Sequence, residues 1–188
     1  MADTQLTTTN LTTSAATFLA NRFTQAGWEI YWQMSDIVSG TATNGSVTIV
    51  AEFPAEPAML VLPPKTRTSS EVLLPAFSIQ ISAEPIEIER AGLGEEIFLQ
   101  QAQLFVDGYA VDLAQHMAFA TMLRNWFKDG TVLPIYDFED SPGNPSLLED
   151  EVVIMENRSV IRLIDVDPNT PRQARYYLSM EVDLVFYD

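Results

Sequence analysis

The sequence predicts an α+β domain, in which a mainly antiparallel β-sheet is flanked by two helices. Two segments have apolar residues at helical spacing, one near the N-terminus at about 14–26 and one at about 112–128. Most other apolar residues lie in short runs that alternate with polar residues, as in half-buried strands. A doubly wound parallel sheet is the second choice, because it requires more alternation of strands and helices than this chain contains.

The N-terminal region is expected to begin as an arm and continue as a helix. Residues 1–12 are polar and rich in Thr, which predicts a flexible arm. Thr13 or Ser14 can cap the helix that follows, and Gly27 is expected to end it. We treat 1–188 as a single α+β domain that carries this arm.

The next 50 residues contain strand, turn and proline signals. Trp28–Trp32 alternates and is rich in aromatic residues, which indicates a strand. The Asn44-Gly45 pair favours a hairpin turn, so Val47–Phe53 is expected to pair back on the earlier strand. Residues 54–75 hold five prolines and predict an extended insertion around a short edge strand, Met59–Leu62.

The centre of the chain, Glu96–Phe138, predicts a compact unit of strand, helix and strand. Its first strand is expected to end in a tight turn at Asp107-Gly108. The helix follows Asp112 and is expected to stop at Asp129-Gly130, and the run 132–136 then begins the second strand. Such a unit can bury one face of a sheet.

Three more strands are predicted on the C-terminal side of this unit. Val152–Met155 and Val160–Val166 are separated by three polar residues and predict a hairpin. The last strand runs from Tyr176 to Phe186, and its even-numbered apolar residues share one face.

The chain is strongly acidic, with 26 acidic and 10 basic side chains and a formal net charge of −16. Residues 71–188 hold 21 of the acids and seven of the bases, so the excess belongs to the expected folded body. DNA binding depends on clustered Lys and Arg at the phosphates, which argues against a nucleic-acid-binding protein. Solubility is the simplest explanation of this charge.

Cysteine is absent, which excludes disulfides, thiolate catalysis and Cys-based metal sites. The N-terminus has neither the basic region nor the long apolar region of a signal peptide, and no segment resembles a membrane span. We therefore expect a soluble protein without a membrane partner.

No residue pattern is typical of an active site, so we expect no enzyme, no cofactor and no metal ion. His116 is the only histidine and lies within the central helical pattern, where a packing role is favoured over acid–base chemistry. Acidic runs at 95–96, 139–140 and 149–151 have the ligands of a hard-cation site, but loop carboxylates of this kind are usually solvated.

Several motifs occur in a recognisable order. They are Pro75–Ile79 (PAFSI), Ile86–Arg90 (IEIER) before Gly92–Gly94 (GLG), Gly108–Ala110 (GYA) before the central helix, and Val132–Asp137 (VLPIYD). With an N-terminal helix and a terminal apolar strand, this order resembles the tail terminator proteins of the tailed-bacteriophage neck. The resemblance covers roughly residues 14–188 as an arrangement of elements.

The resemblance implies a non-enzymatic virion protein, assembled in the host cytoplasm, that forms a ring, typically hexameric. Such a ring caps the tail tube, joins it to the head-completion or connector protein, and lets DNA pass without specific binding. A lumen lined by carboxylates would repel the phosphate backbone and let the genome slide, which would give the acidic excess a role beyond solubility.

Two groups of residues are candidates for these roles. The candidate lumen acids lie in expected loops: Glu139, Asp140, Glu149, Asp150 and Glu151. The candidate subunit-interface residues are three arginines and three aromatic side chains: Arg90, Arg158, Arg162, Trp28, Tyr31 and Trp32. Arginines can pair with acids of a neighbouring subunit, and Trp and Tyr are favoured in protein interfaces.

Other functions stay open at this stage. The proline-rich insertion and the length are compatible with another neck or tail-completion component. A small-ligand or carbohydrate-binding module would use exposed Trp and Tyr as platforms, and an enzyme with an unassigned carboxylate pair ranks third.

Overall fold

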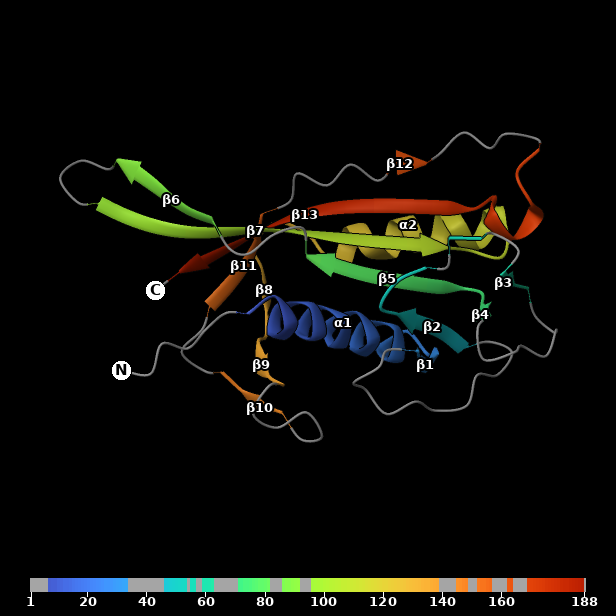
Figure 1. The fold of residues 1–188 in the computed structure, drawn as a ribbon, viewed down its shortest axis with the longest axis horizontal. Coiled ribbons are helices and arrows are strands. Elements are labelled where there is room, and N and C mark those ends of the chain that lie inside the picture. Colours follow the sequence, from blue (N-terminus) through green and yellow to red (C-terminus); the bar gives the residue numbers. More distant parts are fainter. Residues whose placement is uncertain are drawn as a thin grey trace.

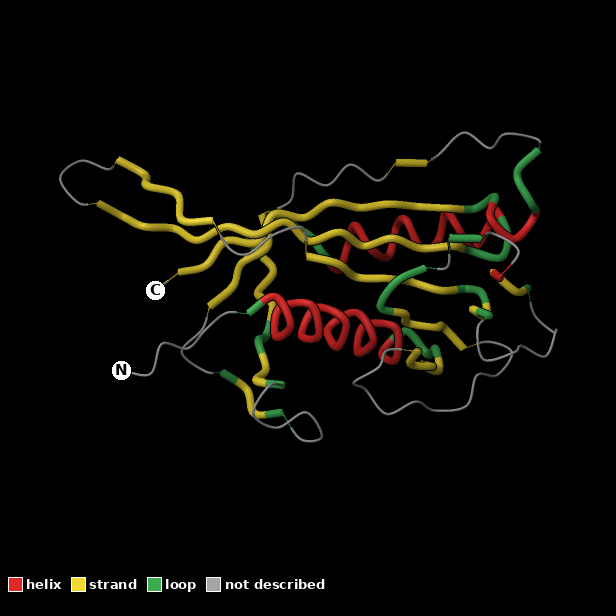
Figure 2. The backbone as a smooth tube through the Cα atoms, viewed as in Figure 1, coloured by secondary structure: helices red, strands yellow, loops and turns green. Residues whose placement is uncertain are grey.

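The predicted α+β architecture is confirmed by a computed structural model of the chain (Figures 1 and 2). The structure describes residues 7–33, 46–53, 55–56, 59–62, 71–81, 86–91, 96–138, 145–148, 152–156, 162–163 and 169–187. Within these ranges a nine-stranded sheet carries two α-helices, and two small two-stranded sheets lie outside it.

The elements follow one another along the chain with these bounds. The helices are α1 (Thr8–Gln25), α2 (Leu113–Trp126) and the short 3-10 helix η2 (Arg172–Ala174). The strands before α2 are β1 (Glu29–Gln33), β2 (Ser46–Val50), β3 (Leu60–Val61), β4 (Val72–Leu73), β5 (Ala76–Ile81), β6 (Ile86–Ala91) and β7 (Glu96–Tyr109). Those after α2 are β8 (Thr131–Leu133), β9 (Tyr136–Asp137), β10 (Ser146–Leu147), β11 (Val152–Glu156), β12 (Arg162–Leu163) and β13 (Tyr177–Tyr187).

The large sheet has the strand order β1-β2-β5-β7-β13-β11-β8, with β6 paired to β7 and β12 paired to β13. Six of its eight strand pairs are antiparallel, as expected. The pairs β1-β2 and β2-β5 are parallel, so the hairpin expected between the first two strands is wrong. A parallel pair requires the chain to return to the same end of the sheet, which a two-residue turn cannot do.

The two long strands β7 and β13 form the centre of the sheet. They pair over ten positions, from Tyr109 opposite Tyr177 to Gln100 opposite Phe186. The turn expected at Asp107-Gly108 is wrong, because both residues lie within β7 and pair with β5 on one side and β13 on the other.

Gly108 is required at this position by its neighbour on β5. Phe77 lies directly opposite Gly108, and a Cβ added to the glycine would lie 2.6 Å from Cδ1 of the Phe77 ring. The ring therefore occupies the space that any other side chain at 108 would need. A glycine within a strand often marks such a close approach rather than a turn.

The hairpin expected from Val152–Met155 and Val160–Val166 is also wrong. β11 and β12 both pair antiparallel with β13, at its C-terminal and N-terminal halves respectively. They therefore run in the same direction along one edge of β13 instead of against each other.

Helix α1 begins six residues before the expected start. Thr7 is its N-cap, and the Thr7 side chain accepts a hydrogen bond from the backbone N–H of Asn10 at 3.2 Å. Residues 8–12 belong to the helix, with Leu11 fully buried, so the arm expected over 1–12 is wrong for these residues. Residues 1–6 lie outside the described part of the chain.

Two buried polar side chains explain why this polar segment is helical and packed. Ser14 Oγ accepts a hydrogen bond from the backbone N–H of Tyr136 at 2.9 Å, and Asn10 Oδ1 accepts one from Phe138 at 2.9 Å. These side chains satisfy backbone donors of the segment that contains β9. The polar residues that indicated an arm are thus used as internal hydrogen-bond partners.

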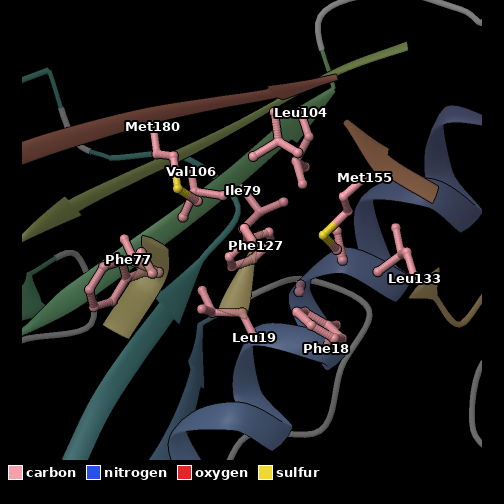
Figure 3. Packing of buried hydrophobic residues seen from close by; sticks show 14 of the residues in the cluster. Phe18, Leu19, Phe77, Ile79, Leu104, Val106, Phe127, Leu133, Met155 and Met180 are labelled. Atoms are coloured by element: carbon pink, nitrogen blue, oxygen red, sulfur yellow. The ribbon is translucent and has the colours of Figure 1, made fainter. Parts of the chain in front are cut away.

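Both α-helices pack on the same face of the sheet and on each other. Phe23 of α1 lies 5.6 Å from Phe119 of α2 and 5.0 Å from Phe77 of β5, measured between ring centroids. Phe18 of α1 contacts Phe127, which follows α2, at 5.3 Å. Figure 3 shows Phe18, Phe127 and Phe77 within one continuous core together with sheet residues.

Near β2 the opposite face of the sheet is covered by a small second cluster. Leu60 of β3 and Val72 of β4 pack there with Val50 and Ala76. Thr48 is also buried and donates a hydrogen bond from Oγ1 to the carbonyl oxygen of Leu73 at 2.7 Å. The strand expected at 59–62 is therefore not an edge of the main sheet, since β3 pairs with β4 in a separate sheet.

The start of α2 agrees with the prediction, whereas the helix ends at Trp126, with Phe127 as its C-cap, before the expected stop at Asp129-Gly130. Asp112 is the N-cap, and its side chain accepts a hydrogen bond from the backbone N–H of Gln115 at 2.8 Å. Gly130 has a φ of 76°, a conformation that glycine adopts without strain.

Replacing Gly108 with Ala should destabilise the fold by about 1–3 kcal/mol, because the new methyl group must displace the Phe77 ring. Urea unfolding followed by fluorescence measures this change in the free energy of unfolding. In a Phe77→Leu background the same Gly108→Ala substitution should cost clearly less. Equal costs in the two backgrounds would show that the ring is not the cause.

Candidate interaction surfaces

The candidate lumen acids cannot be placed, because Glu139, Asp140, Glu149, Asp150 and Glu151 all lie outside the described residues. Arg158 lies outside them as well. The lumen and interface roles predicted for these six residues stay predictions.

The other two candidate arginines lie in two separate strands, β6 and β12. Arg90 is in β6, opposite Ile97 of β7, and Arg162 is in β12, opposite Ser179 of β13 (Figure 1). The structure does not bring them together.

The aromatic candidates on and near β1 pack against the core of their own chain. Tyr31 is only 7 % exposed. Trp28 and Trp32 are half-buried, and Trp28 lies 5.5 Å from Phe119 between ring centroids. Trp126, the third tryptophan, is half-buried against Phe23 at 4.9 Å. The subunit-interface role of these residues stays a prediction. Trp28 and Trp32 are more exposed than Tyr31 and therefore have more surface for such a contact.

The sheet face turned away from the helices carries a group of carboxylates. On β13, Met180 and Val182 are buried in the core with the helices, so the alternating residues Glu181 and Asp183 lie on the other face. The same alternation on β7 and β11 places two further acids there. We call these residues the acidic face: Asp107, Glu156, Glu181 and Asp183.

The register of the strands concentrates this charge. Glu156 of β11 lies directly opposite Asp183 of β13, and Glu181 is two residues further along β13. Like charges directly opposite each other in an antiparallel pair are destabilising. The described side chains of β5, β7, β11 and β13 include no Lys or Arg. These strands therefore present a negative surface.

At one end of the acidic face, Asp107 is held by tyrosines. Tyr177 donates a hydrogen bond from its hydroxyl to Oδ1 of Asp107 at 2.7 Å, and Tyr109 lies 5.0 Å from Tyr177 between ring centroids. Burial and the neighbouring Asp107 carboxylate raise the pKa of both tyrosines. For Tyr177 the hydrogen bond to Asp107 raises the pKa further, so its neutral form is the stable donor.

Helix α2 presents an apolar surface to solvent. Leu113 is 60 % exposed and Met117, one turn later, is 50 % exposed, although helices usually bury such side chains. Small exposed residues surround them. We call this surface the α2 apolar face: Leu113, Ala114, Met117, Ala118 and Thr121.

His116 occupies the opposite side of α2. It is 5 % exposed and lies 6.4 Å from Tyr176 between ring centroids, and its Nδ1 has no hydrogen-bond partner in the structure. Within the described ranges no three His, Cys, Asp or Glu side chains are grouped so that they could hold a metal ion. His116 is therefore packed on the buried side of α2, as the sequence favoured.

The sequence contained a signal for the acidic face. It was missed because the candidate lumen acids were sought in the expected loops. The strict alternation of 176–186 already set Glu181 and Asp183 apart from the apolar side. Asp107 was missed for a different reason, because Asp107-Gly108 indicated a turn. The α2 apolar face has no sequence signal, since its residues look like core residues of an amphipathic helix.

The fold and these surfaces define an α+β protein with a negative sheet face and an exposed apolar helix face. No family model matches the chain, and no curated protein matches its sequence. Among the described helices, none has the length and apolar character needed to span a membrane.

Replacing Tyr177 with Phe should change the stability of the protein at alkaline pH. Tyrosines of the unfolded chain titrate near pH 10.0, and Tyr177 titrates higher when folded. The contribution of Tyr177 to the free energy of unfolding is therefore fully present below pH 10.0. It is lost as the pH rises towards the higher pKa of the folded state. Tyr177→Phe should cost about 1 kcal/mol at pH 8, from the lost hydrogen bond, and weaken the decline between pH 9 and 12.

Urea unfolding at several pH values measures both effects. The matched control is Tyr136→Phe, which removes a half-buried tyrosine that has no hydrogen bond to Asp107. An unchanged alkaline decline in Tyr177→Phe would contradict the assignment.

Proposed function

We propose that this protein is a structural component of the tailed-phage neck, a tail terminator. Copies of it form a ring that caps the tail tube and joins it to the head-completion proteins. DNA passes through the ring without being bound. The observation that carries the proposal is the acidic face, together with the resemblance in the order of motifs.

The acidic face suits a channel wall because it combines charge with rigidity. Its residues lie on β7, β11 and β13, the strands that also build the core, so the backbone that carries these carboxylates is held by strand pairing and core packing. Fixed negative charge repels DNA phosphates, and binding through counterion release requires the opposite charge. A duplex can therefore slide along such a wall without adhering.

The sheet also has two end strands, which lie at opposite ends of its strand order. In the described part of the chain these are β1 and β8. A sheet edge is a template for pairing with another chain unless it is covered. Edges at both ends of one sheet favour a head-to-tail arrangement, which closes into a ring if the rotation between copies allows it.

The alternative of a carbohydrate-binding module has less support. All three tryptophans pack against the core, and the side chains that are large, apolar and exposed in the described ranges are Leu113, Met117, Val132 and Leu147. None of these four is aromatic, so they provide no open stacking platform.

The first test is the assembly state of the purified chain. Negative-stain images should show closed rings, alone or on added tail tubes, with a channel on the order of 20 Å or more across for duplex DNA. Sedimentation velocity gives the mass of the same species. Isolated single copies in the presence of tail tubes would overturn the proposal.

The second test reverses charge on the acidic face. Glu181→Lys with Asp183→Lys should give a ring that retains duplex DNA at low salt, and the affinity should fall steeply as salt is added. The control is Glu52→Lys with Glu56→Lys, which changes the net charge equally at exposed residues outside this face.

Fluorescence anisotropy with a labelled duplex measures both variants. The wild-type ring and the control should bind at least roughly tenfold more weakly than the acidic-face variant. Equal binding by control and variant would show that the acidic face does not line the channel.

A further inference from the structure

β7 extends beyond the rest of the sheet and forms a protruding hairpin with β6 (Figure 1). The pairing of β13 with β7 ends at Gln100 of β7, whereas the pairing of β6 with β7 continues to Glu96 of β7. Beyond Gln100, β6 is therefore the one described strand that pairs with β7. We call this two-stranded part the hairpin tip: Ile88–Ala91 paired with Glu96–Leu99.

A two-stranded ribbon of this kind needs a covering partner. Isolated hairpins are marginally stable in water, and stability comes from a third strand or from packing on a helix. The sequence of the tip is rich in apolar residues, with Ile88, Ile97, Phe98 and Leu99. In register, Ile88 lies opposite Leu99.

The α2 apolar face is an uncovered helix surface of complementary character. Within α2 the only charged residue is Arg124, although the whole chain contains 26 acids. The hairpin segment 86–101 contains four acids and one arginine. An acidic hairpin that approaches another copy meets repulsion on most of an acidic surface, and less of it on this helix, whose residues include no acid after the N-cap Asp112.

The hairpin cannot cover the helix of its own chain. In Figure 1 the β6–β7 hairpin projects from one end of the molecule, while α2 lies along the other half of the sheet. A contact between the two surfaces must therefore join different copies. Such a contact uses two different patches and repeats from copy to copy, which generates a ring when it closes.

We infer that the hairpin tip of one copy docks on the α2 apolar face of the next copy, centred on Leu113 and Met117. This inference rests on the proposed ring and names the surfaces that would close it. The partner is a second copy of this chain.

Site-specific crosslinking tests the contact. Because the chain has no native cysteine, only the introduced thiols can react. The variant Ile88→Cys with Met117→Cys, treated with a short bismaleimide, should give a ladder of covalent oligomers on a denaturing gel. The control Ile88→Cys with Glu56→Cys places the second thiol at an exposed residue that is not part of α2 and should stay mostly monomeric.

A substitution in the helix face gives a second measurement. Met117→Lys should weaken self-association by about tenfold or more, because it buries a charge in the contact. Asn125→Lys adds the same charge at an exposed polar residue of the same helix and should leave association near wild type. Sedimentation velocity over a range of concentrations measures both.

The outcomes separate this inference from the proposed function. Rings in negative stain without crosslinks between 88 and 117 would overturn the docking and leave the ring intact. Dimers from Met117→Cys alone, at the same yield, would show a contact between two α2 helices and also overturn it. A chain that never self-associates would overturn both proposals.

Discussion

The contact between Phe77 and Gly108 is the constraint on which the rest of the structure depends. Because residue 108 has no side chain, the Phe77 ring lies over the β7 backbone and meets Phe23 of α1 and Phe119 of α2. One ring thus joins the centre of the sheet to both helices. The absence of a side chain also lets β7 continue as a strand where the sequence indicated a turn. This continuity lets Gly108 and Tyr109 pair with β5 on one side and with β13 on the other.

The burial of α1 is the second feature that organises the fold. The helix contacts the sheet on one side and the segment around β9 on another, and ten of its 18 residues are buried. Small residues such as Ala15 and Ala16 allow this close packing. Asn10 and Ser14 can be buried because each accepts a hydrogen bond from a backbone N–H that would otherwise have none.

With both helices on one face, the sheet is left with two different surfaces. One buries the apolar residues of β7 and β13, and the other carries the acidic face and, near β2, the small cluster of β3 and β4. This asymmetry gives four of the 26 acids a common place on one face of the sheet. The proposed channel wall uses the acidic face, and the proposed contact between copies uses the hairpin tip and the α2 apolar face.

The sequence by itself determined which segments form helices and strands and which face of the long strands is apolar. Both follow from periodicity and capping, which are local. The α+β class, the start of α2 at Asp112 and the alternation of β13 were all predictable. Strand pairing was not, since register and direction depend on partners far along the chain, as in the parallel β1-β2 pair. Only the tertiary structure placed Asp107 and Glu156 beside Glu181 and Asp183, and only it left Leu113 and Met117 uncovered. Whether an acidic or apolar side chain stays exposed depends on which other parts of the chain pack against it. The pattern of a single sequence does not contain that information.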